Sequence, residues 1–155
     1  MNYEALLGKE NKIVQVGIAG IGDFGKSLLA RSKKIIGFEV TLICDKDTHR
    51  METALSDCGM SNSKITMVEK IEDNKNTPFD LLVEATGNPE CAAKNAKWAL
   101  ANKKHVVMAS KEASIVVGPI LHQMAQSNGV VYTEAEGDQP SLLLGFISWA
   151  KTLGL

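Results

Sequence analysis

A glycine-rich turn is the segment of this sequence best suited to chemistry. Its six residues are Gly20, Ile21, Gly22, Asp23, Phe24 and Gly25, which match the pattern G-x-G-x-x-G. An apolar run precedes the turn and a helical pattern follows it. In that context Gly20 permits a tight turn, Gly22 lets the backbone approach a pyrophosphate, and Gly25 permits close helix packing. The helix N-terminus would offer free N–H groups to the phosphates. The alternative is a tight turn that binds no ligand.

An acidic residue follows at the spacing expected for a ribose contact. Asp45 ends the second apolar run, twenty residues after Gly25. A carboxylate there accepts hydrogen bonds from the adenosine ribose of NAD and repels the 2′-phosphate of NADP. Lys46, His49 and Arg50 follow and would instead accommodate that phosphate. The sequence therefore predicts NAD or NADP, with a slight preference for NAD, and includes Asp45 and Lys46 among the contacts. As an alternative, Asp45 is a helix N-cap, a role for which Asp47 and Thr48 compete.

Ala85, Thr86 and Gly87 come at the end of a later apolar run. Ligands of open parallel sheets bind at the carboxyl ends of the strands. We therefore expect Thr86 and Gly87 to face the nicotinamide ribose. The alternative is a loop in which Asn88 caps a helix that starts with Pro89. The two interpretations are compatible.

Lys111 and Asp138 are the candidate catalytic residues. Lys111 follows a predicted strand at 105–109, where an ammonium group can polarise a carbonyl or carry a proton. The alternative is a surface lysine paired with Glu112. Asp138 follows the last predicted strand and is a candidate acid or base on the substrate side. Its alternative role is to cap the helix that Pro140 opens.

Strands and helices alternate along the whole chain. Strands are predicted over 12–19, 38–44, 64–68, 80–85, 105–109 and 130–133, and helices over 23–36, 48–57, 89–101, 118–128 and 140–153. This order predicts an α/β fold of the Rossmann type, a doubly wound and mostly parallel six-stranded sheet with helices on both faces. Residues 12–155 would form this dinucleotide-binding domain, and residues 1–11 a short appended helix.

Composition excludes several other classes. The chain has 155 residues, a net charge of −1, 45% hydrophobic and 23% charged residues. This balance argues against a nucleic-acid binder and against a disordered chain. No apolar run is long enough to span a membrane, and the first residues lack the apolar region of a secretory signal. Three scattered cysteines suit a reducing compartment and form no metal-binding pattern. We expect a soluble, cytoplasmic, single-domain chain.

Several segments together resemble a known family. GIAGIGDFG, EATG, HVVMASKEA and GDQP are similar to segments of homoserine dehydrogenase-like oxidoreductases, and most of all to the branch with a C-terminal SAF domain. The resemblance covers essentially the whole chain, and GDQP followed by a helix with Trp149-Ala150 is its more specific motif. It implies the NAD(P)-binding domain of an enzyme that transfers hydride to or from a small hydroxy or carbonyl substrate.

The same resemblance bears on the candidate site. The family carries an Asn-Lys pair after the fifth strand, with the lysine in the active site. Here the pair is Ser110-Lys111, followed by Glu112. Lys111 therefore matches, whereas Ser110 departs from the asparagine that contacts the nicotinamide side. Ser110 is retained as a predicted cofactor contact.

The length of the chain limits what it is expected to do. In such oxidoreductases a second domain holds the substrate, and 155 residues leave no room for one. We expect the chain to bind NAD(P) and to turn nothing over by itself, with homo-oligomers compatible with the sequence. The alternatives are a non-catalytic module that senses nicotinamide nucleotides and a module for another nucleotide, such as coenzyme A.

Overall fold

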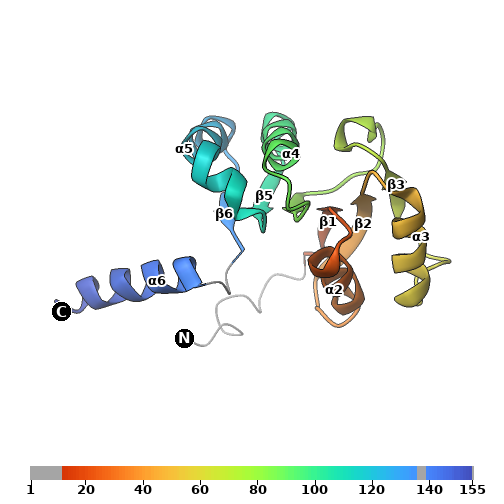
Figure 1. Ribbon diagram of the computed structural model, residues 1–155, viewed down its shortest axis with the longest axis horizontal. Coiled ribbons are helices and arrows are strands. Elements are labelled where there is room, and N and C mark those ends of the chain that lie inside the picture. Colours follow the sequence, from red (N-terminus) through yellow and green to blue (C-terminus); the bar gives the residue numbers. More distant parts are fainter. Residues whose placement is uncertain (1–11, 136–138, 155) are drawn as a thin grey trace.

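A six-stranded sheet forms the centre of the computed structural model, which describes residues 12–135 and 139–154. Its strands are β1 (Val14–Ala19), β2 (Phe38–Cys44), β3 (Thr66–Val68), β4 (Leu81–Glu84), β5 (His105–Met108) and β6 (Tyr132–Glu134). The spatial order is β3-β2-β1-β4-β5-β6, and every neighbouring pair is parallel (Figure 1). This order confirms the predicted α/β fold of the Rossmann type.

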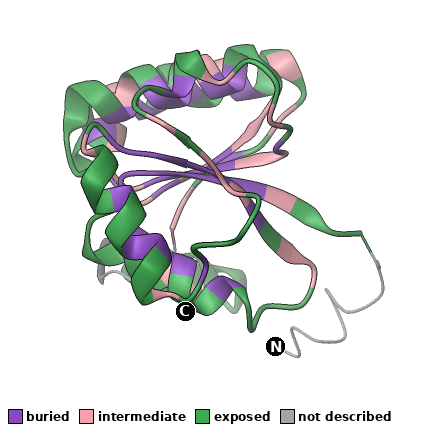
Figure 2. Ribbon diagram, turned by 90° about the vertical axis from the view of Figure 1, so that its right-hand side faces the viewer, coloured by how far each residue is buried: buried purple, intermediate pink, exposed green. Residues whose placement is uncertain are grey.

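Helices cover both faces of the sheet (Figure 2). They are α2 (Asp23–Ser32), α3 (Thr48–Asp57), α4 (Pro89–Ala101) and α5 (Lys111–Asn128), followed by α6 (Gln139–Thr152). A short 3-10 turn, η1 (Ile71–Asp73), lies between β3 and β4 and buries Ile71. One core cluster joins α2 and α3 to the sheet, and the other joins α4 and α5 to the opposite face.

The continuous apolar character of the strands follows from this double covering. Val16 and Ile18 of β1 point into the cluster under α2 and α3, whereas Ala19 belongs to the cluster under α4 and α5. All three are fully buried. Successive strand residues point to opposite faces, so both faces need apolar side chains here.

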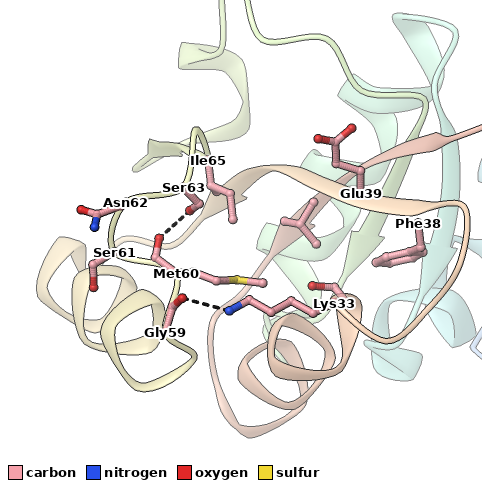
Figure 3. A pocket seen from close by; sticks show the side chains of 11 residues that line it. Lys33, Phe38, Glu39, Gly59, Met60, Ser61, Asn62, Ser63 and Ile65 are labelled. Atoms are coloured by element: carbon pink, nitrogen blue, oxygen red, sulfur yellow. Dashed lines mark hydrogen bonds between the residues drawn. The ribbon is translucent and has the colours of Figure 1, made fainter.

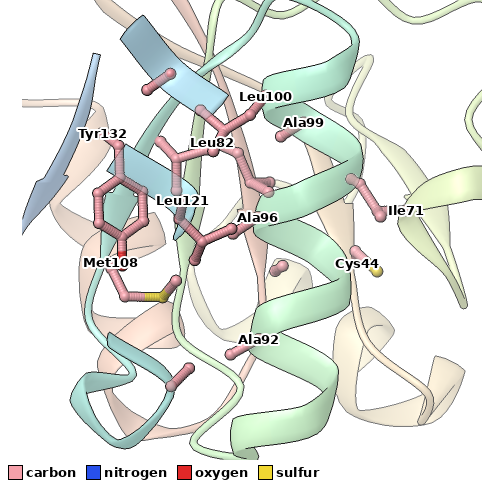
Figure 4. Close-up of a cluster of buried hydrophobic side chains, with 14 of the residues drawn as sticks. Cys44, Ile71, Leu82, Ala92, Ala96, Ala99, Leu100, Met108, Leu121 and Tyr132 are labelled. Carbon is pink, nitrogen blue, oxygen red and sulfur yellow. The ribbon is translucent and has the colours of Figure 1, made fainter. Parts of the chain in front are cut away.

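Small side chains bring α4 close to the sheet. Ala92, Ala96 and Ala99 are fully buried and face the strands, as Figure 4 shows for the cluster around Leu82. Alanine at this spacing forms one narrow helix face, so the α4 backbone approaches the sheet more closely than a leucine face would allow. The first turn of α4 is thereby placed over the carboxyl ends of the central strands.

Two predicted helix boundaries are wrong. Helix α5 begins at Lys111, not at Gly118, and Pro119 lies inside it. Ala113 and Leu121 are buried at helical spacing on both sides of the proline, so packing outweighs the lost hydrogen bond. Helix α2 ends at Ser32, one turn before the predicted end at Ile36, which is fully exposed.

The remaining boundaries agree to within two residues, and the helix predicted for residues 1–11 lies outside the described residues.

Helix α6 extends away from the sheet (Figure 1). It begins one residue before the predicted Pro140 and exposes large apolar side chains, among them Leu143, Phe146 and Trp149. Among the helices in the described part of the chain, none is both long enough and apolar enough to cross a membrane.

Candidate functional site

A cavity of about 570 Å³ opens where the strand order reverses, at the carboxyl ends of β1 and β4. The glycine turn follows β1, and the Ala85–Asn88 loop, defined as residues 85–88, follows β4. Six of the predicted cofactor contacts line this cavity: Gly20, Gly22, Asp45, Lys46, Ala85 and Thr86. Reversal points of this kind are where open α/β sheets bind ligands.

Gly20 lies where two backbone segments meet. Its φ angle is +91°, and its N–H donates to the carbonyl of Cys44 at 2.8 Å. A Cβ atom here would lie 2.5 Å from the carbonyl carbon and oxygen of Ala85 and 2.6 Å from the nitrogen of Thr86. A Cβ atom on Gly25 would overlap the carbonyl oxygen of Gly20. Both glycines are therefore required by packing, as predicted for a tight turn and a close helix approach.

Gly22 is different, because a Cβ atom there would meet nothing within 4 Å. It is the N-cap of α2, and it has no side chain with which to cap the free N–H groups of the first turn. The next two helices, α3 and α4, are capped: Asp47 accepts from the N–H of Arg50 at 3.0 Å, and Asn88 accepts from that of Cys91 at 2.9 Å. Ser110 makes no capping hydrogen bond to α5, but it does not line this cavity. The open N-terminus at the cavity therefore belongs to α2.

Asp45 is nearly buried and fixes the glycine turn. Its Oδ2 accepts from the N–H of Ile21 at 2.8 Å, and its Oδ1 accepts from that of Asp47 at 3.0 Å. Arg50 Nη1 lies 3.7 Å from Oδ2. The alternative role as an N-cap is excluded, because Asp47 caps α3. Each carboxylate oxygen keeps a lone pair, so Asp45 can still accept from a ligand hydroxyl.

The Ala85–Asn88 loop is held from two sides. The side chain of Glu84, fully buried at the end of β4, accepts from the Thr86 hydroxyl at 2.6 Å and from its N–H at 3.2 Å. From the other side, the Ser110 hydroxyl oxygen accepts from the Gly87 N–H at 2.9 Å. Ser110 is itself buried, and it precedes Lys111, the first residue of α5. Asn88 caps α4, so the two interpretations of this segment are compatible.

Charges around the cavity are balanced. Among the described residues, four basic and four acidic side chains line it: Lys46, Arg50, Lys70 and Lys94, and Asp45, Glu69, Glu72 and Glu90. Lys94 Nζ donates to Glu90 Oε1 at 2.7 Å, which lowers the pKa of Glu90 and raises that of Lys94. An anionic ligand would therefore be held by backbone N–H groups and a helix dipole more than by net positive charge.

The other predicted contacts take different places. Ile21 is buried, with its N–H directed at Asp45, whereas Asp23 and Phe24 are exposed on the first turn of α2. Lys111 lies at the carboxyl edge of β5, and Asp138 is outside the described residues.

Sequence reasoning missed the face of α4 that borders the cavity, which includes Asn88, Cys91 and Asn95. The signal was available, because α4 directly follows the strand that ends at the reversal point.

A second cavity, of about 620 Å³, lies at the opposite end of β2 (Figure 3). Phe38, Val40 and Met60 line it together with Lys33, whose ammonium group donates to the carbonyl of Gly59 at 2.9 Å. It borders the amino end of the strand, and none of the predicted site residues that the structure describes lines it.

The fold and the first cavity together define a dinucleotide-binding domain of the Rossmann class. Residues 17–134 match the family model of the NAD-binding domain of homoserine dehydrogenase. Because this match covers most of the chain, the chain belongs to that family. No curated protein sequence matches it.

Three solved structures with the same fold are longer than this chain. An oxidoreductase from Agrobacterium radiobacter, solved with NAD+, L-tartaric acid and magnesium, is 17% identical with a TM-score of 0.68, and the match covers 81% of this chain and 36% of that one. A homoserine dehydrogenase from Thiobacillus denitrificans is 25% identical with a TM-score of 0.61, covering 78% and 29%. The WlbA dehydrogenase from Chromobacterium violaceum, solved with NADH and UDP-GlcNAcA, is 14% identical with a TM-score of 0.66, covering 82% and 36%. The chain thus spans about a third of the length of these proteins.

Proposed function

We propose that this chain holds NAD(H) in the cavity between the glycine turn and the Ala85–Asn88 loop. The observation that carries the proposal is the uncapped N-terminus of α2, where Gly22 leaves open space beside free N–H groups. A pyrophosphate suits this place, because it accepts from such groups and is favoured by the helix dipole. The adenosine ribose would be bound by Asp45, which offers lone pairs at the cavity wall.

The proposal extends to the chemistry of the parent protein. A bound nicotinamide ring supplies hydride transfer, and the chain would orient that ring at the carboxyl end of β4 and β5. Lys111 would act there on a small hydroxy or carbonyl substrate, because it starts α5 directly after Ser110, which holds Gly87. Asp138 is the second proposed catalytic residue. The substrate would be bound by a domain outside this chain, so the chain alone would bind cofactor without turnover. The SAF branch stays a prediction.

Calorimetric titration of the chain with NADH, NADPH and coenzyme A tests this function. We expect NADH to bind, and Gly22→Ala to weaken that binding at least tenfold because its methyl group would stand in the space for the phosphates. Gly145→Ala is the control. A Cβ atom at Gly145 also meets nothing within 4 Å, but Gly145 lies on α6 and does not line the cavity, so NADH binding should be unchanged. If neither dinucleotide binds at millimolar concentration, the proposed function is wrong.

The choice of NAD over NADP rests on Asp45. Its carboxylate would face the ribose 2′ position, where a phosphate would meet a like charge. Arg50, 3.7 Å away, and the exposed Lys46 oppose that preference. We expect NADH to bind several-fold more tightly than NADPH, and Asp45→Asn to reduce the difference while keeping an acceptor for the Ile21 N–H. Equal discrimination by the variant would refute this role.

A further inference from the structure

A buried carboxylate lies in the last row of the sheet. Glu84 pairs in register with Ala19 on one side and Met108 on the other, and all three are fully buried. An apolar side chain would fit this row, as Leu82 does two residues earlier on the same face. A buried carboxylate is costly unless hydrogen bonds compensate it, so Glu84 carries a cost that an apolar residue would avoid.

The hydrogen bonds of Glu84 are concentrated on one oxygen. Oε1 accepts from the hydroxyl and the N–H of Thr86, and from Asn95 Nδ2 at 3.5 Å. Oε2 has no hydrogen-bond partner among the described residues. The carboxylate therefore accepts hydrogen bonds from Thr86 of the Ala85–Asn88 loop and from Asn95 of α4. Asn95 extends the same network to the Cys91 sulfur at 3.6 Å, on the wall of the cavity.

The Thr86 end of the loop touches the glycine turn directly. The backbone of Ala85 and Thr86 fills the space beside Gly20, and the Thr86 side chain lies on the cavity wall. Its hydroxyl donates to Glu84 and accepts from the N–H of Asn88 at 3.4 Å. Without Glu84, this hydroxyl and the Thr86 N–H would lose the acceptor that fixes their direction.

We propose that Glu84 is a positioning residue that fixes the Ala85–Asn88 loop for contact with the nicotinamide half of the dinucleotide. The inference rests on the proposed function for its ligand. This role of Glu84 needs a hydrogen-bond acceptor at the position of Oε1 and does not need the negative charge. Glutamine would therefore replace Glu84, because its oxygen can take the place of Oε1 and its amide the place of Oε2. Methionine has a similar shape and provides no comparable acceptor, so it would release the loop.

The test compares Glu84→Met and Glu84→Gln in binding NADH and in binding ADP, which lacks the nicotinamide half. Glu84→Met should weaken NADH binding about tenfold, equivalent to about 1.4 kcal/mol, and change ADP binding less than about threefold. Glu84→Gln should retain NADH binding within about threefold. Thr86→Val should weaken NADH binding as Glu84→Met does, whereas Thr86→Ser should retain it. The double variant Glu84→Met, Thr86→Val should bind NADH no more weakly than either single variant, because both changes remove the same interaction.

Amide hydrogen exchange of the ligand-free chain separates this inference from the proposed function. Exchange at Thr86 and Gly87 should accelerate in Glu84→Met and not in Glu84→Gln. If exchange changes this way but NADH binds neither the wild-type chain nor any variant, the proposed function fails while the role of Glu84 in fixing the loop stands. The inference is overturned if a folded Glu84→Met variant keeps both its amide exchange rates and its NADH affinity unchanged. It is also overturned if Glu84→Met loses as much affinity for ADP as for NADH, or if Glu84→Gln loses as much NADH affinity as Glu84→Met. Should Glu84→Met not fold, Thr86→Val provides the same test, because the Thr86 side chain is only partly buried.

Discussion

Replacing Gly20 by alanine should reveal the packing role of the glycine turn. Gly20 has a φ angle of +91°, which side chains with a Cβ rarely adopt, and it faces the backbone of Ala85 and Thr86. A left-handed backbone costs a non-glycine residue about 1–2 kcal/mol. The added methyl group would lie 2.5 Å from Ala85, so the loop must move outward by roughly an ångström before contact is ordinary. Overpacking of this kind costs about 1–3 kcal/mol.

The two contributions sum to about 2–5 kcal/mol of lost stability. For a chain of this length each kcal/mol lowers Tm by roughly 2–4 °C, so a loss of about 4–20 °C is expected. Calorimetry or circular dichroism at several heating rates measures this loss. Gly22→Ala is the matched comparison, because Gly22 has a φ angle of −78° and open space around it. It should cost under about 1 kcal/mol, a small loss from the weaker cap.

The two variants should therefore differ in stability. Gly20→Ala should lose stability, and some NADH affinity as well because the displaced loop lines the cavity, whereas Gly22→Ala should lose NADH affinity with little loss of stability. A Gly20→Ala chain as stable as the wild type would refute the packing argument. So would a Gly22→Ala chain destabilised to the same extent, since the structure gives its methyl group nothing to strike.

Three further outcomes are expected. Burial raises the pKa of Cys44 to about 12, with the nearby Cys91 adding to the shift, so unfolding releases its proton above pH 9. Stability should then fall between pH 9 and pH 12 by up to about 1.4 kcal/mol per pH unit, and urea titrations of Cys44→Ala should show a shallower fall. Ser110→Ala removes the acceptor of a loop N–H and should cost about 0.5–1.5 kcal/mol in chemical denaturation; a larger loss would mean that Ser110 does more than hold the loop. The ion pair between Lys26 and Asp57, at 2.6 Å, is solvent-exposed, so Lys26→Met should leave the denaturation midpoint nearly unchanged.

Much of the fold follows from patterns that local physics makes strong. The strand at Phe38–Cys44 and the helices at Thr48–Asp57 and Pro89–Ala101 were predicted to the residue. An apolar run bounded by turns specifies a covered strand, and Asn88 before Pro89 specifies a helix start. The sequence places the start of helix α5 too late, because Gly118 and Pro119 look like a local start signal, whereas burial on both sides of the proline continues the helix back to Lys111.

The candidate site was predictable only in part, for a related reason. The glycine turn and Asp45 can be recognised from their local sequence, and Gly20, Gly22 and Asp45 line the cavity. The role of Glu84 is not visible there, because it depends on Ala19 and Met108 closing over it from neighbouring strands. A carboxylate at the end of an apolar run looks like the start of a loop until the register across three strands is known.

The strand order has a consequence for how the site comes into being. Strands β1 and β4 are neighbours in the sheet although β2, α3 and β3 lie between them in the chain, and Gln15 donates to the Asp80 carboxylate across 65 residues. The two walls of the cavity therefore belong to different halves of the chain, and the cavity exists only once those halves have joined. Contacts this distant form late, since loop closure must precede them. Ligand binding during refolding would thus report the docking of the halves, which the early formation of helices would not reveal.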